Sequence, residues 1–228
     1  MWVSNGENAL ANDVTVKRAI ETGDVEALQR LLAEDASRAN ALIHWGANNC
    51  NATHPLHYIS DMLFGGTLKK GMEVPLMEAL IDAGADLDFQ TAAKADTPLI
   101  GAASLGAEEA GLVLLRAGAR PELRGIFGET ALHWAALLGE DRLAARLIEA
   151  SDLDLADEKY NSPPLGWAIH GWQNPPSGNM GRQCEVATLL VAAGARVDPT
   201  WLDSEQLRAD PLMLAALKRF QPLSLGEH

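Results

Sequence analysis

Two short patterns recur together along this chain, and their spacing restricts the fold more than any single residue does. An opening pattern, Pro or Ala followed by Leu, begins after residues 54, 97, 130 and 163, and 33 residues separate the second, third and fourth of these starts. A closing pattern, Leu with a second aliphatic residue, begins at residues 80, 114, 147 and 190, and Ala-Gly-Ala completes it in three of the four segments. A fixed period of this length predicts a repeat protein.

The residue types in both patterns suit a pair of packed helices. A Thr hydroxyl, as in Thr97 and Thr130, can cap the free amides of a first helical turn, and Pro fits the next position because no donor is needed there. A Gly that follows the two aliphatic residues favours a helix that ends with this Gly in the left-handed backbone conformation. Apolar residues make up 47% of the chain and aromatic residues only 5%, so the expected core consists mainly of Ala and Leu in close-packed helices.

The two patterns resemble the ankyrin-repeat family, which opens its first helix with Thr-Pro-Leu-His and ends its second with Leu-Leu-x-x-Gly-Ala. The resemblance covers roughly residues 14 to 220. It implies an all-α ankyrin-repeat solenoid of helix-turn-helix units with hairpin fingers, about four central repeats and two caps. We expect one domain over 1–228, divided into an extension (1–13), an N-terminal capping repeat (14–40), central repeats (53–90, 96–122, 129–156, 162–198) and a C-terminal cap (200–220).

The two ends of the chain depart from the repeat as caps do. The N-terminal unit lacks the opening pattern and has a polar face. Near the other end, Asp210-Pro211-Leu212 restarts the opening pattern, so we expect a first helix there that is not followed by a complete second helix.

Two repeats are longer than the others. The opening residue and the closing glycine lie 30 positions apart from His54 to Gly84 and 31 apart from Pro163 to Gly194, against 21 in the third unit. The extra residues should fall between the two helices, near 64–71 and 171–179, where Gly and Pro predict loops. They are either neutral insertions or two loops that flank a binding face.

Two rows of residues fall at equivalent positions of the first helices, which line the concave face in this family. The first row contains aromatic rings interrupted by Gly101, which would leave a gap for a ligand between Tyr58 and Trp134. The rings either cover the Ala-rich helix layer or form a recognition surface. The candidate ligand- or partner-binding residues are Tyr58, Asp61, Ser104, Trp134, Trp167, His170 and Trp172.

The segment from Tyr160 to Trp172 resembles a variant opening found in a group of bacterial ankyrin-repeat proteins. Gly166 stands where the usual opening has His, and His170 follows four residues later on the expected groove side. His170 is either a general acid or base, with Asp61 as the other catalytic candidate, or a partner contact or a helix-end hydrogen bonder.

Other chemistry is disfavoured by spacing. Asp61, Ser104 and His170 have the residue types of a hydrolytic triad, but neighbouring helices lie about 8 to 10 Å apart, so residues three repeats apart cannot form one. Cys50, His54 and His57 have spacing that is weakly diagnostic of zinc, and we expect no metal. Known phosphate-loop, dinucleotide and nucleophile-elbow motifs are absent from the sequence, so no cofactor is expected.

Charge and segment composition limit the partners. A formal net charge of −13 disfavours nucleic acid and anionic membranes, which attract clustered Lys and Arg. The chain has no long apolar run, no leader-like start and only two cysteines, which favours a cytoplasmic location.

The function expected from these features is a binding module. It would recognise a protein or peptide through the concave face and the fingers, with the aromatic row as anchors. The alternative is a cofactor-independent lyase, isomerase or hydrolase that binds a small molecule in the same groove and uses His170 as its acid or base.

Overall fold

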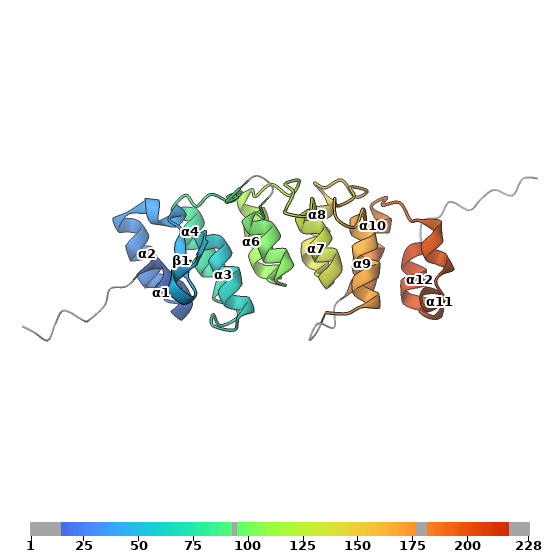
Figure 1. Ribbon diagram of the computed structural model, residues 1–228, viewed down its shortest axis with the longest axis horizontal. Coiled ribbons are helices and arrows are strands. Elements are labelled where there is room, and N and C mark those ends of the chain that lie inside the picture. Colours follow the sequence, from blue (N-terminus) through green and yellow to red (C-terminus); the bar gives the residue numbers. More distant parts are fainter. Residues whose placement is uncertain (1–14, 93–94, 177–181, 219–228) are drawn as a thin grey trace, which may run out of the picture. The chain divides into compact units, whose positions relative to one another are not determined.

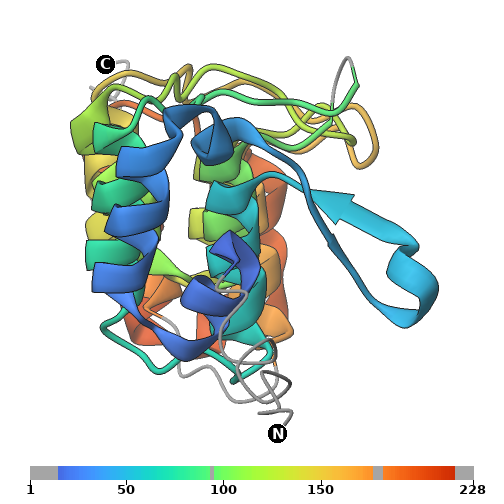
Figure 2. The ribbon, with the colours of Figure 1, turned by 90° about the vertical axis from the view of Figure 1, so that its left-hand side faces the viewer.

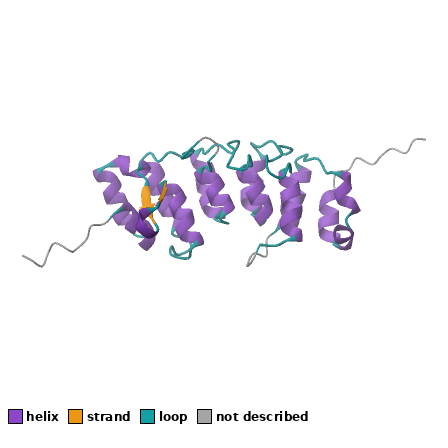
Figure 3. Ribbon diagram, in the orientation of Figure 1, coloured by secondary structure: helices purple, strands orange, loops and turns teal. Residues whose placement is uncertain are grey.

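The computed structural model describes residues 15–92, 95–176 and 182–218, and most of their regular structure is helical (Figures 1 and 3). The chain divides after Asp86 into two compact units, which are described separately below.

The first unit contains two helix pairs joined by a hairpin. Helix α1 packs against α3 and α2 against α4, so the first helices and the second helices of the two pairs form separate layers. Ile20, Leu28, Leu56 and Leu80 are completely buried between them. The elements are α1 (Val16–Thr22), α2 (Val25–Glu34), the short 3₁₀ helix η1 (Ala36–Asn40), β1 (Ile43–Trp45), η2 (Ala47–Asn49), β2 (Asn51–Thr53), α3 (Pro55–Phe64) and α4 (Glu73–Asp82).

The second unit repeats this arrangement. Helices α5, α7 and α9 follow one another in the layer of first helices, while α6, α8 and α10 form the layer of second helices. Leu114, Leu132, Leu147 and Leu165 are buried in the core. The elements are α5 (Pro98–Ser104), α6 (Glu108–Ala117), α7 (Ala131–Leu138), α8 (Asp141–Ile148), α9 (Pro164–Gln173), α10 (Gln183–Ala192), η3 (Pro199–Asp203), α11 (Glu205–Ala209) and α12 (Pro211–Lys218).

The helix ends form as the opening and closing patterns predict. The Thr97 hydroxyl accepts a hydrogen bond from the Ile100 amide at 3.2 Å, and Pro98 occupies the first turn of α5. Gly118 ends α6 with φ of 99°, a left-handed conformation that a side chain disfavours. These helix boundaries are therefore encoded by local residue choice.

The first helices also approach closely because one of them carries glycine. A Cβ atom at Gly171 of α9 would lie 2.0 Å from the Leu137 carbonyl oxygen of α7. That oxygen instead accepts a hydrogen bond from the Gln183 side chain at the start of α10. Any larger residue at Gly171 would push α9 away from α7.

The segments that connect one helix pair to the next are called fingers here, and hydrogen bonds link them. In the first unit, β1 and β2 pair antiparallel, with His44 opposite Ala52, and extend away from the helices as an arm (Figure 2). In the second unit, the Arg120 guanidinium and amide both bond Asp88, and Arg196 bonds Asp154 in the same way. An arginine that follows Gly-Ala thus fastens its finger to the preceding one.

Both predicted insertions lie between the helices of a pair. One joins α3 to α4 and the other joins α9 to α10. Residues 177–181 of the second loop lie outside the described residues. The extra length therefore leaves the helix layers of both pairs intact.

The C-terminal cap differs from its prediction. Pro211 begins α12, but α12 packs on α10 and so takes the place of a second helix. The first-helix place is taken by η3 and the short α11, whose Leu207 is buried. The prediction of a first helix at Pro211 is wrong because a Pro-Leu opening marks a helix start but does not specify which layer the helix joins.

A membrane-spanning helix is not found among the described residues, since none of their helices combines the necessary length and apolar character.

Two buried histidines hold neighbouring segments together. His133 accepts from the Thr130 amide at 3.1 Å, and its other ring nitrogen bonds the Leu155 carbonyl at 3.0 Å. His54 bonds the Asn40 side chain at 3.0 Å. Burial lowers the pKa of both imidazoles to about 4, with nearby His57 contributing for His54.

The protein should lose stability as the pH falls from about 6.5 to about 4. Over this window the unfolded chain binds protons at both histidines while the folded chain does not, so each costs up to about 2 to 3 kcal/mol of unfolding free energy. Urea titrations across this pH range measure the slope of the unfolding free energy against pH. His133→Gln should flatten it and the exposed His44→Gln should not; equal slopes in all three proteins would contradict this assignment.

Candidate functional site

A groove of about 700 Å³ opens on the layer of first helices in the second unit. Helix α7, the finger that precedes α9, α9 itself, η3 and α11 all contribute to its lining. We call it the aromatic groove; its lining residues are Trp134, Leu137, Tyr160, Ser162, Gly166, Trp167, Ile169, His170, Gln173, Thr200, Trp201, Ser204 and Leu207. Its volume and mixed lining are typical of a site that binds a side chain or a small molecule.

Gly166 contributes a part of the groove lining that has no side chain. The equivalent residue of α7 is His133, which is fully buried and bonded to its neighbouring finger. A Cβ atom at Gly166 would lie 2.2 Å from the Ser162 hydroxyl and 3.5 Å from the Trp201 ring. The exchange of His for Gly in this repeat therefore removes a hydrogen bond to a finger, and the place of a Cβ atom is taken by the Ser162 hydroxyl.

Two tryptophans meet at a right angle in the groove. The ring centroids of Trp134 and Trp167 lie 5.0 Å apart, and their planes are inclined by 82°. Each indole N–H donates to a carboxylate at 3.0 Å, from Trp134 to Glu129 and from Trp167 to Asp157. These bonds fix both rings against fingers that are themselves hydrogen-bonded.

Asp157 organises the finger that borders the groove. It is 2% exposed, and its carboxylate accepts from the Lys159, Tyr160 and Ser162 amides at 2.6 to 3.1 Å, in addition to the Trp167 indole. Burial opposes its ionisation, but these donors outweigh burial and hold the pKa of the carboxyl below its usual value. One carboxylate thus sets both the loop conformation and the orientation of an aromatic wall.

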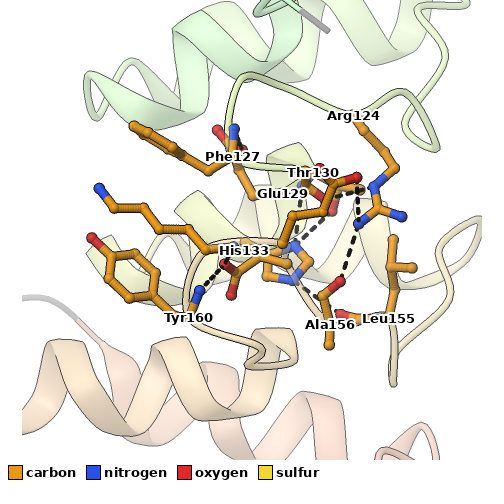
Figure 4. Close-up of polar contacts among 12 residues, drawn as sticks. Arg124, Phe127, Glu129, Thr130, His133, Leu155, Ala156 and Tyr160 are labelled. Atoms are coloured by element: carbon orange, nitrogen blue, oxygen red, sulfur yellow. Dashed lines mark hydrogen bonds and ion pairs between the residues drawn. The ribbon is translucent and has the colours of Figure 1, made fainter.

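The preceding finger is fastened to the same loop (Figure 4). The Arg124 guanidinium donates to the Gly128 carbonyl at 2.6 Å and to the Ala156 carbonyl at 3.1 Å. Glu129 accepts from the Phe127 amide at 2.8 Å, so both of its oxygens have donors. The groove therefore has a rigid edge made of two fingers that are hydrogen-bonded to each other.

Three of the residues predicted from sequence come together in the aromatic groove. Trp134 is partly exposed, Trp167 is 6% exposed, and His170 is exposed. Because Trp167 is mostly covered, it is a wall of the groove more than an exposed anchor. The His170 ring has no hydrogen-bond partner among the described residues.

The remaining predicted residues lie elsewhere. The Trp172 indole donates to Asp210 at 3.1 Å and so joins α9 to the cap, and the Ser104 hydroxyl donates to the Gly101 carbonyl within α5. Tyr58 and Asp61 belong to the first unit. Tyr58 is 1% exposed and donates to Glu21 at 2.7 Å, so it offers almost no surface to a partner. Burial raises the pKa of Asp61.

Two groove residues, Tyr160 and Trp201, were not among the predicted site residues. Tyr160 lies in the finger with 61% of its surface exposed, 6.0 Å from the Trp167 ring. Trp201 lies on η3, in the segment where the repeat pattern is lost. The concentration of aromatic residues near residue 160 was a usable signal, whereas no pattern placed Trp201 against α9.

The described residues contain no group of three or more His, Cys, Asp or Glu side chains arranged to hold a metal ion.

Helix pairs stacked through shared layers, with fingers at one end and a groove on the first helices, define a repeat protein of the interaction class. A family model described as ankyrin repeats in three copies matches residues 63–157. This part of the chain therefore consists of ankyrin repeats, and such repeats are in general protein–protein interaction modules. No curated protein matches the chain.

Replacing Asp157 should destabilise the finger. Asp157→Asn retains one acceptor oxygen, so the free energy of unfolding should fall by about 2 kcal/mol or more at pH 7. Because the folded pKa of Asp157 is depressed, its contribution is present above pH 4 and is lost as the pH falls further, so the variant and the parent should converge in acid.

Urea denaturation followed by tryptophan fluorescence measures this difference. The exposed Asp152→Asn, in the same finger with one bond at 3.0 Å, is the matched control and should change stability by less than about 1 kcal/mol. Similar losses of unfolding free energy in both variants would contradict the conclusion that Asp157 organises the finger.

Proposed function

We propose that this protein binds a protein partner through the aromatic groove. The observation that carries the proposal is the convergence of Trp134, Trp167, Trp201 and His170 on one open groove of about 700 Å³. Tryptophan supplies a large contact area with few rotatable bonds, and for this reason it is enriched among residues that dominate binding energy.

The rigid edge of the groove supports the same function. The indole groups of Trp134 and Trp167 donate hydrogen bonds to carboxylates, and Arg124 links the two surrounding fingers by a hydrogen bond. A binding surface that is ordered before the partner arrives loses less conformational entropy on association. The expected partner is therefore a protein segment that inserts one side chain into the groove and contacts the finger with its flanks.

The alternative of a cofactor-independent enzyme has less support. A general acid or base needs a group that orients it and a neighbouring nucleophile or substrate contact. His170 lines the groove, but its imidazole makes no hydrogen bond within the described residues, and Asp61 belongs to the other unit. The groove is better suited to contact than to proton transfer.

A cytoplasmic location remains part of the proposal. Cys50 is exposed, and neither it nor Cys184 is in a disulfide, a state that a reducing compartment maintains.

Placing a larger side chain at Gly166 should weaken partner binding without unfolding the protein. In Gly166→Leu, the new side chain displaces the Ser162 hydroxyl and projects toward Trp201, while the indole bonds of Trp134 and Trp167 do not involve residue 166. Partners are first identified by affinity capture on the full chain, and their binding to purified protein is then measured by calorimetry. The dissociation constant should rise by about tenfold or more.

Two further variants define the surface. Trp201→Ala should weaken binding in the same way, because Trp201 is a wall of the groove. Phe64→Ala removes a ring that is 70% exposed on the first unit, and it should leave the affinity unchanged. A partner that binds all of these proteins equally would place its site elsewhere.

A further inference from the structure

The aromatic groove has a distinctive combination of ring surface and charge. Among the described residues that line it are three tryptophans and one tyrosine, but no Lys, Arg, Asp or Glu. Aromatic faces carry negative electrostatic potential, so a groove of this composition attracts a cation even without a carboxylate in its lining.

Buried carboxylates strengthen this potential from behind. Glu129 is 0% exposed and Asp157 is 2% exposed, and each accepts the indole N–H of one groove tryptophan at 3.0 Å. A carboxylate on the N–H polarises the indole and places a full negative charge behind the ring edge. Because these carboxylates are shielded from water, their field is screened less than that of surface acids.

We propose that the groove binds an arginine side chain of the partner, which stacks on the partly exposed ring of Trp134 beside Trp167. This inference rests on the proposed function and names the chemical group that the groove recognises. The formal net charge of −13 favours the approach of a basic segment over long range.

Guanidinium fits the groove better than ammonium does. It is planar, weakly hydrated and able to stack on an indole face, while its edge donates several hydrogen bonds. The Ser162 hydroxyl and the Gln173 amide line the groove and are acceptors for those donors. An ammonium group would keep more of its hydration and use less of the ring surface.

One cation of the chain already lies over aromatic rings in the finger that borders the groove. The Lys159 ammonium lies 4.1 Å from the centroid of the Phe127 ring and 5.0 Å from that of Tyr160. Since this lysine occupies the Tyr160 ring, the proposal relies on the tryptophans. The partner's cation would occupy the part of the groove between α7, α9 and η3.

N-acetylarginine amide and N-acetylcitrulline amide are the probes, because they have nearly the same shape and differ in charge. We expect the arginine compound to shift the indole ¹H–¹⁵N signals of Trp134 and Trp167 in the full chain, with at least about fivefold higher affinity than the citrulline compound. Single Trp→Phe variants assign the signals. Equal binding of both compounds, or no shift from the arginine compound at about 50 mM, would overturn the proposal.

Variants separate the site from general attraction to an acidic protein. Gly166→Leu should abolish the arginine-dependent shifts, whereas Leu212→Ala, at a residue 71% exposed on α12, should retain them. Glu129→Gln should weaken arginine binding by about threefold or more, since it removes charge behind Trp134. Retained shifts in Gly166→Leu would place the cation elsewhere and reject the proposal.

The outcomes also distinguish this inference from the function on which it rests. If Gly166→Leu loses the protein partner while the parent fails to bind the arginine probe, the groove is the interaction site but does not recognise a cation. If the arginine probe binds in the groove but partner binding is unaffected by Gly166→Leu, the proposed function fails and the cation site stands alone.

Discussion

The shared burial of apolar side chains between successive helix pairs is the constraint on which the structure depends. No pair can cover its own Leu and Ala residues: α7, for example, contacts α5 on one side and α9 on the other. Leu132 and Ala135 become fully buried only because both neighbours are present. Close packing requires small residues at the contacts, and Gly171 shows how little room remains, because a Cβ there would meet the α7 backbone.

The same stacking explains why a site arises where the repeat is broken. A regular repeat places His at the opening, where His133 fills the space beneath a finger and bonds the next one. In the following repeat Gly166 has no side chain to do this, and η3 with α11 takes the place of a regular first helix. The aromatic groove is therefore the result of two departures from the repeat pattern, which occur in adjacent repeats of the second unit. The finger that borders the groove is held by His133 at the Leu155 carbonyl and by Asp157 through backbone and indole donors.

The groove residues differ in how far sequence could identify them. Trp134 and Trp167 occupy equivalent positions of neighbouring first helices, so the 33-residue spacing was sufficient to predict that they lie together, as the 5.0 Å between their rings confirms. Tyr58 occupies the equivalent position of its own repeat but is buried against Glu21, because the β1–β2 arm places Trp45 beside its ring. Position within a repeat therefore predicts the face of a helix, but exposure depends on what the neighbouring loop covers.

The sequence by itself determined the helix pairs, the residues that begin and end their helices, and the places of the two insertions. These features follow from local preferences of Thr, Pro and Gly and from the repeat spacing. Only the tertiary structure decided that α12 joins the layer of second helices, that Trp172 bonds the cap, and that Trp201 closes the groove. These contacts join segments about 20 or more residues apart without any repeated pattern. Their energies come from packing and hydrogen bonds that exist only once the layers have formed.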